Sequence, residues 1–261
     1  MPVQHLPLSP NSRITSLKKL NNFVFTTSSD GTCVVYDPRA NIVSMTWSVK
    51  NALSCSDISG FIVATGSDKD LNNISNPIIY NESHGDDVTF IKFHEENTNM
   101  VFSSDVDGLI SCSDYKLGNE DESLQMVLNE GTSVSSFNFL GNSKEYLSCL
   151  THTENLSVWD LNNVTRIKSY GDLRTPFLET PSKFNYALNS MTFDNHLYTF
   201  CGSQSGALYL YHIGLNEIKL YESFLNGHSD IVRTCEYNQQ KDYFISGGED
   251  GIISFWTKQL E

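Results

Sequence analysis

A stretch near the carboxyl end of the chain, Asn226–Trp256, constrains the fold more than any other part of the sequence. It opens with Gly227-His228, alternates apolar and polar side chains over two segments, turns at Asp250-Gly251 and ends on Trp256. This alternation predicts three antiparallel strands joined by tight turns. A sheet this small has apolar faces that it cannot bury by itself, so it needs similar neighbours elsewhere in the chain.

Five weaker copies of the same pattern precede it. Each ends on an aromatic or polar residue followed by a polar one, at Asp37, Asn81, Asp114, Asp160 and His212. Successive copies are separated by about 33 to 52 residues, close to the period of about 40–45 residues in four-stranded propeller blades. Three copies place Asp-Gly before their last strand, a pair that suits the positive φ of tight hairpins: Asp30-Gly31, Asp107-Gly108 and Asp250-Gly251. The sequence therefore predicts an all-β fold, a β-propeller with six visible four-stranded blades, formed by residues 1–261 as a single domain.

The two ends of the chain are predicted to close this ring together. Only five residues follow Trp256, too few for the outer strand of the last blade. The segment Val3–Leu8 precedes the first expected inner strand, around Arg13–Leu20, and residues 1–8 are expected to supply the missing outer strand. Pro7 is tolerated there because an outer strand is a sheet edge.

The closing repeat resembles the repeats of WD-repeat proteins in its Gly-His pair, its tight turn and its final Trp. In those families four such residues form a structural relay of hydrogen bonds, from the indole through a hydroxyl and an imidazole to a carboxylate. The resemblance implies this relay for Trp256, Ser246, His228 and Asp250. A Ser-His-Asp hydrolase triad has the same composition, but the Trp and its position in the repeat favour the structural interpretation.

The third copy keeps part of this set. It has His84, Ser103 and Asp107 at the corresponding positions, but Ser113 stands where the Trp belongs. A buried polar network stabilises a fold fully only when every member is satisfied. We therefore expect the third repeat, like the other incomplete copies, to depend mainly on apolar packing.

The middle of the chain resembles one group of WD-repeat proteins in particular. Ser83–Asp114 is similar to the fourth repeat of the WD repeat-containing protein 89 family, and Cys149–Asn163 is similar to the next, with Thr151-His152 where other WD proteins have Ser-Gly. The resemblance covers essentially the whole chain and implies an intracellular, non-enzymatic WD-repeat protein of the nucleus or the cytoplasm. Members of that family carry one further repeat upstream, so either this ring has six blades or it is an incomplete ring of seven.

The formal net charge of −14 restricts the classes of partner. Duplex nucleic acids and anionic membranes are bound through Lys and Arg, so direct binding to either is not expected. The acidic segment Asp114–Glu130, with Glu120, Asp121 and Glu122 at its middle, is a candidate site for a Lys/Arg-rich segment of a partner protein. The alternatives are a solvated linker, and an acidity that serves only solubility.

A second candidate interaction site is Tyr36-Asp37-Pro38-Arg39. It resembles the Trp-Asp-x-Arg box with which some WD proteins dock on the adaptor of a cullin-RING ubiquitin ligase, with the Arg as anchor. Tyr replaces Trp here, and Arg39 has the simpler alternative of pairing with an acidic neighbour.

Enzymatic motifs are not found in the sequence. It contains no H-E-x-x-H, no Walker loop and no G-x-G-x-x-G, and its six cysteines form no C-x-x-C pair, so neither a cofactor nor a metal is expected. Three segments are longer than a blade needs and are predicted to be loops: Ser67–Pro77, Asp114–Glu130 and Asp160–Asn185. The sequence thus favours a scaffold or adaptor, a subunit of a larger complex that presents loops to other proteins; an enzyme of unknown class is the remote alternative.

Overall fold

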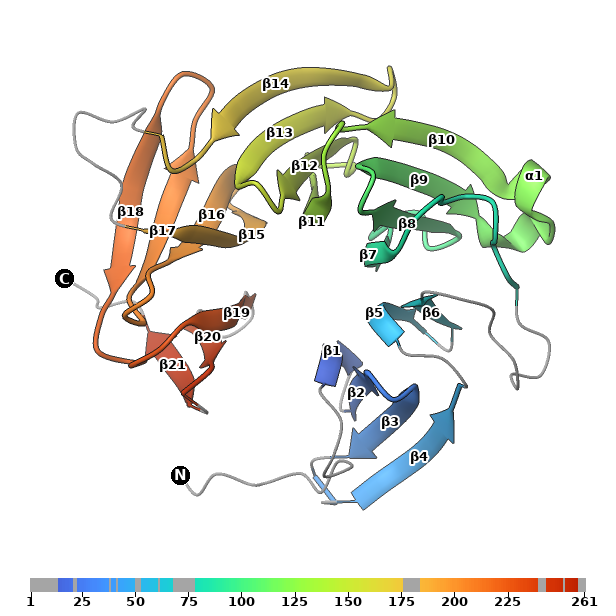
Figure 1. Cartoon of the computed structure of the whole chain (residues 1–261), viewed down its shortest axis with the longest axis horizontal. Coiled ribbons are helices and arrows are strands. Elements are labelled where there is room, and N and C mark those ends of the chain that lie inside the picture. Colours follow the sequence, from blue (N-terminus) through green and yellow to red (C-terminus); the bar gives the residue numbers. More distant parts are fainter. Residues whose placement is uncertain are drawn as a thin grey trace. The chain divides into compact units, whose positions relative to one another are not determined.

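The computed structural model describes residues 14–20, 23–37, 39–40, 42–49, 53–60, 62–67, 78–175, 184–238, 243–250 and 252–257 (Figure 1). The chain forms two compact units, Met1–Val134 and Ser135–Glu261. Within the described residues, every sheet is antiparallel and every strand pairs with strands next to it in the chain. The predicted all-β propeller fold is confirmed, but five blades are recognised where the sequence predicts six. Among the described residues the second predicted repeat forms only a two-stranded sheet.

The first unit contains three sheets. Their strands are β1 Ile14–Leu20, β2 Phe23–Ser28, β3 Thr32–Asp37 and β4 Ile42–Ser48; then β5 Leu53–Ser59 and β6 Ile62–Ser67; then β7 Val88–Phe93, β8 Met100–Asp105, β9 Leu109–Asp114 and β10 Leu124–Asn129. A 3-10 turn, η1 (Tyr115–Leu117), and a one-turn helix, α1 (Glu120–Ser123), connect β9 to β10.

The second unit also contains three sheets. Their strands are β11 Val134–Leu140, β12 Tyr146–Thr151, β13 Asn155–Asp160 and β14 Thr165–Asp172; then β15 Tyr186–Phe193, β16 His196–Gly202, β17 Leu208–Ile213 and β18 Ile218–Phe224; then β19 Val232–Asn238, β20 Tyr243–Gly248 and β21 Ile253–Thr257. Among the described residues, four of the six sheets therefore have the four strands that the sequence predicts, one has three and one has two.

Tight turns join the middle strands where the Asp-Gly pairs predict them. Gly31 and Gly108 have φ of 82° and 91°, a region that side chains other than glycine adopt at a cost. At Gly108 space is limiting as well, because a Cβ atom would lie 2.5 Å from the backbone nitrogen of Thr132. Gly108 is thus required both by its conformation and by its neighbour.

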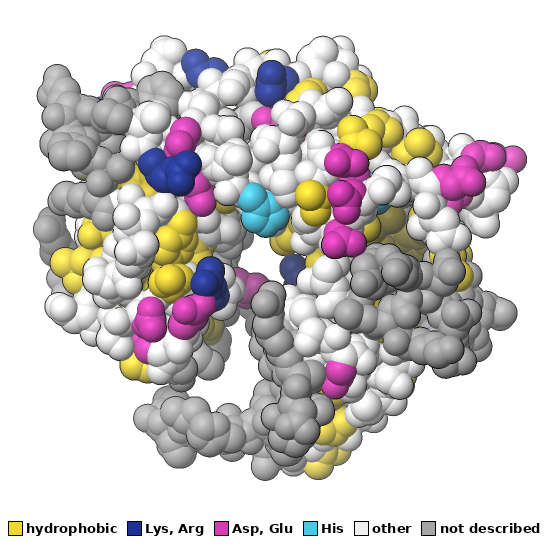
Figure 2. Space-filling view, viewed as in Figure 1, with side chains coloured by type: hydrophobic (Ala, Val, Ile, Leu, Met, Phe, Trp, Pro, Cys, Tyr) yellow, Lys and Arg dark blue, Asp and Glu magenta, His cyan; other side chains and the backbone are white. Residues whose placement is uncertain are grey.

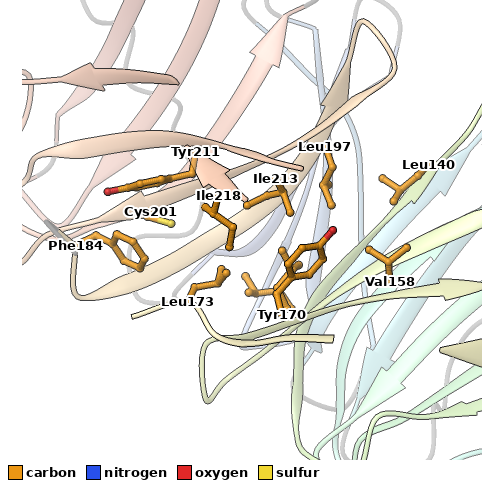
Figure 3. Packing of buried hydrophobic residues seen from close by; sticks show 12 residues of the cluster. Leu140, Val158, Tyr170, Leu173, Phe184, Leu197, Cys201, Tyr211, Ile213 and Ile218 are labelled. Atoms are coloured by element: carbon orange, nitrogen blue, oxygen red, sulfur yellow. The ribbon is translucent and has the colours of Figure 1, made fainter. Parts of the chain in front are cut away.

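The core lies between adjacent sheets and is built from the middle strands. In the second unit, Figure 3 shows side chains of β11 and β13 meeting those of β16, β17 and β18, with Tyr170, Leu173 and Phe184 packed among them. Phe184 and Tyr211 meet edge to face, with ring centroids 5.2 Å apart. Burial of this apolar surface between neighbours is what a single repeat cannot achieve alone.

The six cysteines are distributed one to a sheet, and all are buried free thiols: Cys33, Cys55, Cys112, Cys149, Cys201 and Cys235. Burial raises the pKa of Cys33 and of Cys112 to about 12 and that of Cys55 to about 11. These side chains therefore pack as small apolar groups.

Two of the three predicted long loops contain regular secondary structure. Asp114–Glu130 contains η1, α1 and the outer strand β10, and Asp160–Asn185 contains the outer strand β14. Outer strands are exposed along most of their length, as in β10, where only Leu128 is buried. They therefore lack the apolar alternation by which the inner strands were recognised. The third predicted loop, Ser67–Pro77, lies almost entirely outside the described residues, as does the closing strand expected at residues 1–8.

Candidate functional site

The relay of the last repeat is a continuous chain of hydrogen bonds. The indole Nε1 of Trp256 donates to Ser246 Oγ at 2.7 Å, and Ser246 Oγ lies 2.8 Å from His228 Nε2. His228 Nδ1 lies 3.2 Å from both carboxylate oxygens of Asp250. Because an indole only donates and a carboxylate only accepts, each hydrogen of the chain points from Trp256 towards Asp250 when the imidazole is neutral.

The carboxylate of Asp250 also holds the backbone of its own turn. It accepts the amides of Ser229 and Ile252 at 2.8 and 3.0 Å. Burial disfavours the charged form, but these amides and the imidazole of His228 outweigh it and hold the pKa of Asp250 below its ordinary value. Asp250 therefore joins the turn to the segment that precedes the inner strand β19.

Two glycines make room for this relay. A Cβ atom on Gly227 would collide with the indole ring of Trp256. A Cβ atom on Gly248 would lie 2.7 Å from Asp250 Oδ1 and 2.8 Å from His228 Nδ1. The relay thus depends on six positions of the repeat, whereas the sequence pattern indicated four.

The third repeat forms the same relay with a different carboxylate, which corrects one predicted residue. His84 Nε2 lies 2.7 Å from Ser103 Oγ, but His84 Nδ1 meets Asp105 Oδ2 at 2.8 Å, and Asp107 is exposed. Asp105 Oδ1 accepts the amide of Leu109 at 2.8 Å, just as Asp250 accepts the amide of Ile252.

The exchange of Asp107 for Asp105 has a steric reason. Counted back from the shared Asp-Gly turn, Asp105 occupies the position of Gly248 in the last repeat. A side chain at that position points directly at the imidazole and at the space of the turn carboxylate. Asp105 therefore supplies the carboxylate itself, and Asp107 is displaced to the surface.

In the third repeat, which has no Trp, Glu120 holds the loop before the inner strand. Its carboxylate accepts the amides of Asn81, Glu82 and Ser83 and the hydroxyl of Ser83, at 2.6 to 2.8 Å. Partial burial disfavours the charged form, but these four donors outweigh it and lower the pKa of Glu120. Ser83 stands where the last repeat has Gly227 beneath the indole. Glu120, predicted as an interaction residue, is thus engaged within its own repeat.

The first, fourth and fifth repeats keep the turn bond of the relay. The first repeat uses Asp30, whose Oδ1 accepts the amide of Thr32 at 2.9 Å. The hydroxyls of Thr151 and Ser203 accept the amides of Asn155 and Ala207, both at 3.1 Å, in the fourth and fifth repeats. Trp159 of the fourth repeat donates to Ser157 on its own strand at 3.1 Å, because Cys149 stands at the position of Ser246.

Arg39 forms a bidentate ion pair with Asp37. Its Nε and Nη2 donate to the two carboxylate oxygens at 3.0 and 2.8 Å, and the guanidinium lies 5.6 Å from the centre of the Phe23 ring. These hydrogen bonds from Arg39 lower the pKa of Asp37 to about 2. The Arg39 side chain is still 59% exposed, so one face of the guanidinium is open to solvent.

The same arrangement occurs in the second unit. Arg174 Nε and Nη2 donate to the two carboxylate oxygens of Asp172 at 2.9 and 2.8 Å. The Asp-x-Arg geometry at Arg39 therefore recurs at Arg174 and is a local motif.

Acidic side chains of the third repeat gather in two places, over α1 and near β7 and β8 (Figure 2). On α1, Asp121 and Glu122 are exposed beside the engaged Glu120. Near β7 and β8, the exposed residues Asp86, Asp87 and Asp107 come from two adjoining loops, which the hydrogen bond from Val106 N to Asp87 O connects at 3.2 Å.

Neither a metal site nor a membrane span is seen in the described part of the chain. Its residues include no group of three or more His, Cys, Asp or Glu side chains that could hold a metal ion. None of its helices is long and apolar enough to cross a membrane.

Comparisons with known proteins agree with this geometry. Residues 219–257 match the WD domain, G-beta repeat family. The chain is 31% identical over 248 residues to the WD repeat-containing protein 89 homolog of Dictyostelium discoideum, covering 90% of this chain and 68% of that protein. It is 31% identical over 199 residues to the WD repeat-containing protein GTS1 of Arabidopsis thaliana, of which it spans only 48%.

More distant relatives include the DDB1- and CUL4-associated factor 11 homolog of Caenorhabditis briggsae, 23% identical over 67% of this chain and 37% of that protein. Among solved structures, a chain of the crystal structure of the Mitotic Checkpoint Complex superposes with a TM-score of 0.73 at 12% identity, over 97% of this chain and 77% of that one. This likeness concerns the fold alone, an all-β propeller. By its sequence relatives and its repeats, the chain belongs to the WD repeat-containing protein 89 family of WD-repeat proteins.

Proposed function

We propose that this chain is a non-catalytic scaffold of the nucleus or the cytoplasm that presents loops to other proteins within a larger complex. The observation that carries the proposal is the acidic third repeat on a WD-repeat framework. Between Asn81 and Glu130 the chain has twelve acidic residues and only two lysines. Such a surface attracts Lys/Arg-rich segments and raises their rate of association.

The loops beside β7 and β8 are the stronger of the two acidic surfaces. Asp86, Asp87 and Asp107 are exposed there, and a Cβ atom on Gly85 would lie only 3.6 Å from the carboxylate of Asp107, so the two loops bring their charges together. On α1, Glu120 is engaged, which leaves Asp121 and Glu122 as the candidate contacts.

A binding measurement with paired variants tests this role. Fluorescence anisotropy with a Lys/Arg-rich peptide should show binding that weakens as salt is added, because exposed charges are screened. The triple variant Asp86→Asn, Asp87→Asn, Asp107→Asn should weaken binding by about tenfold or more, whereas Asp121→Asn with Glu122→Gln should have a smaller effect. Binding that neither variant changes would refute an acidic docking surface.

The non-catalytic part of the proposal is supported by how the His, Ser and Asp side chains are used. In the last repeat each is hydrogen bonded to the next, and His228 and Ser246 are buried. Affinity purification from fractionated native cells, followed by mass spectrometry, would identify the partners and their compartment.

A second candidate role is that of a substrate receptor of a cullin-RING ubiquitin ligase. Two observations favour it: the likeness to proteins named as DDB1- and CUL4-associated factors, and the exposed Arg39, which Asp37 holds in a fixed orientation. In a pulldown with purified DDB1, Arg39→Ala should abolish capture. Arg174→Ala, which breaks the equivalent pair in the second unit, is the matched control and should not. Equal capture by wild type and Arg39→Ala would remove this role.

A further inference from the structure

We propose that Ser103 is a covalent modification site, a nucleophile that reacts once with small activated phosphonyl or acyl compounds. His84 is the base that accepts its proton, and Asp105 is the positioning residue that orients His84. The reaction is stoichiometric and therefore compatible with a scaffold.

The geometry of the third repeat fixes these roles. Asp105 is buried and accepts on both oxygens, from the Leu109 amide and from His84 Nδ1, at 2.8 Å in each case. Because a carboxylate cannot donate, Nδ1 carries the hydrogen, and Nε2 of the neutral imidazole is left as an acceptor. Ser103 Oγ, 2.7 Å away, therefore donates its hydrogen to Nε2.

The last repeat has the same three groups but protects its serine. There the indole of Trp256 donates to Ser246 Oγ at 2.7 Å, and Ser246 is 1% exposed. In the third repeat Ser113 stands at the position of the Trp, and Ser103 is partly exposed. Ser103 Oγ thus lacks the indole donor that occupies a lone pair of Ser246 Oγ.

A fluorophosphonate serves as the probe. Ser103 Oγ attacks phosphorus, the Oγ–P bond forms and the P–F bond breaks. The hydroxyl proton passes to His84 Nε2 and then to solvent, and fluoride leaves. The product is a phosphonylated serine, with no change in oxidation state and no further reactant.

Peptide mass spectrometry of the full chain after labelling compares the two serines within one molecule. Both serines face an imidazole, but Ser246 is 1% exposed and bonded to the indole of Trp256, so it should gain nothing from its base. A positioned general base contributes about 10²–10⁴ in rate to an accessible serine, so Ser103 should be labelled at least about 100-fold faster than Ser246. Equal labelling of Ser103 and Ser246 in the folded protein would overturn the proposal.

Two variants separate reactivity from a loss of structure. The double variant Ser83→Gly, Ser113→Trp rebuilds the arrangement of the last repeat, with glycine beneath the indole, and should suppress labelling of Ser103 while the circular dichroism is unchanged. Asp105→Asn should move the pH profile of labelling, an effect that a merely structural role would not produce. Undiminished labelling in the double variant would also contradict the proposal.

Discussion

The third and the last repeats reach the same hydrogen-bonded relay from different residues. In both, an imidazole joins a strand hydroxyl to a carboxylate that also caps the following turn. In both, a serine of the next strand donates to the carbonyl before the His, at 3.2 Å from Ser111 and 2.7 Å from Ser254. The hydrogen-bonded geometry is therefore the same in both repeats, although the carboxylate comes from a different position in each.

The two repeats differ in how the loop before the inner strand is fixed. The last repeat covers it with the ring of Trp256, which packs edge to face on Phe224 at 5.3 Å. In the third repeat the carboxylate of Glu120 accepts hydrogen bonds from the amides of this loop. The contact with Trp256 is apolar, whereas the contact with Glu120 is electrostatic.

Loss of the indole should have the largest effect. Trp256→Ala removes an aromatic side chain and the indole that donates to Ser246, so we expect it to destabilise the second unit by about 3–5 kcal/mol. Chemical denaturation measures this loss. Ser113→Ala at the matched position should cost less than about 1 kcal/mol, and comparable losses at the two positions would contradict the assigned roles.

Substitutions of the two aspartates of the third repeat should differ clearly in their effect on stability. Asp105→Asn weakens the partner of a buried imidazole and should cost about 1–3 kcal/mol, whereas Asp107→Asn is exposed and should change stability by less than about 0.5 kcal/mol. Thermal unfolding of the two variants makes the comparison. A larger effect at Asp107 would restore the residue that the sequence indicated.

The exchange of positions can be imposed on the last repeat. Gly248→Asp alone places a second carboxylate against Asp250 and should be destabilising, because the new side chain meets Asp250 Oδ1 and His228 Nδ1. Adding Asp250→Gly removes that conflict and should recover part of the loss, on the order of 1 kcal/mol in a double-mutant cycle. Strict additivity of the two changes would show that the positions do not share one site.

Substitution of Glu120 should have the smallest effect on stability, and this effect should depend on pH. Its pKa is lower in the folded chain than the ordinary value of 4.5, so its contribution is present at neutral pH and is lost as the pH falls through the lowered value. Glu120→Gln should weaken this dependence and speed hydrogen exchange at the amides of Asn81, Glu82 and Ser83. Unchanged exchange at these amides would show that the hydrogen bonds to Glu120 do not hold this loop.

The inner strands and the tight turns could be predicted from the sequence because their physics is local. Alternating side chains and Asp-Gly pairs specify strands and hairpins within a few residues. The outer strands β10 and β14 were missed because their side chains are mostly exposed on both faces, so burial imposes no period on them.

The resemblance predicted the relay residues of the last repeat, but it predicted those of the third repeat only in part. Asp107 occupies the expected place in the Asp-Gly turn, and nothing in the spacing indicates that Asp105 excludes it. The available signal was a carboxylate side chain at the position that is glycine in the last repeat, where the turn carboxylate reaches the imidazole. The hydrogen bonds of Glu120 join residues that are 37 to 39 positions apart in the sequence, and no local pattern reveals such contacts.

The six buried thiols make the chain convenient to label. Burial keeps them protonated, and alkylating reagents react with the thiolate, so iodoacetamide should modify the native cysteines slowly while the chain is folded. A cysteine introduced at an exposed site such as Asp121 would then take up a fluorophore ahead of all six. Two such sites, one in each unit, would allow the separation of the units to be measured by energy transfer without first removing any native cysteine.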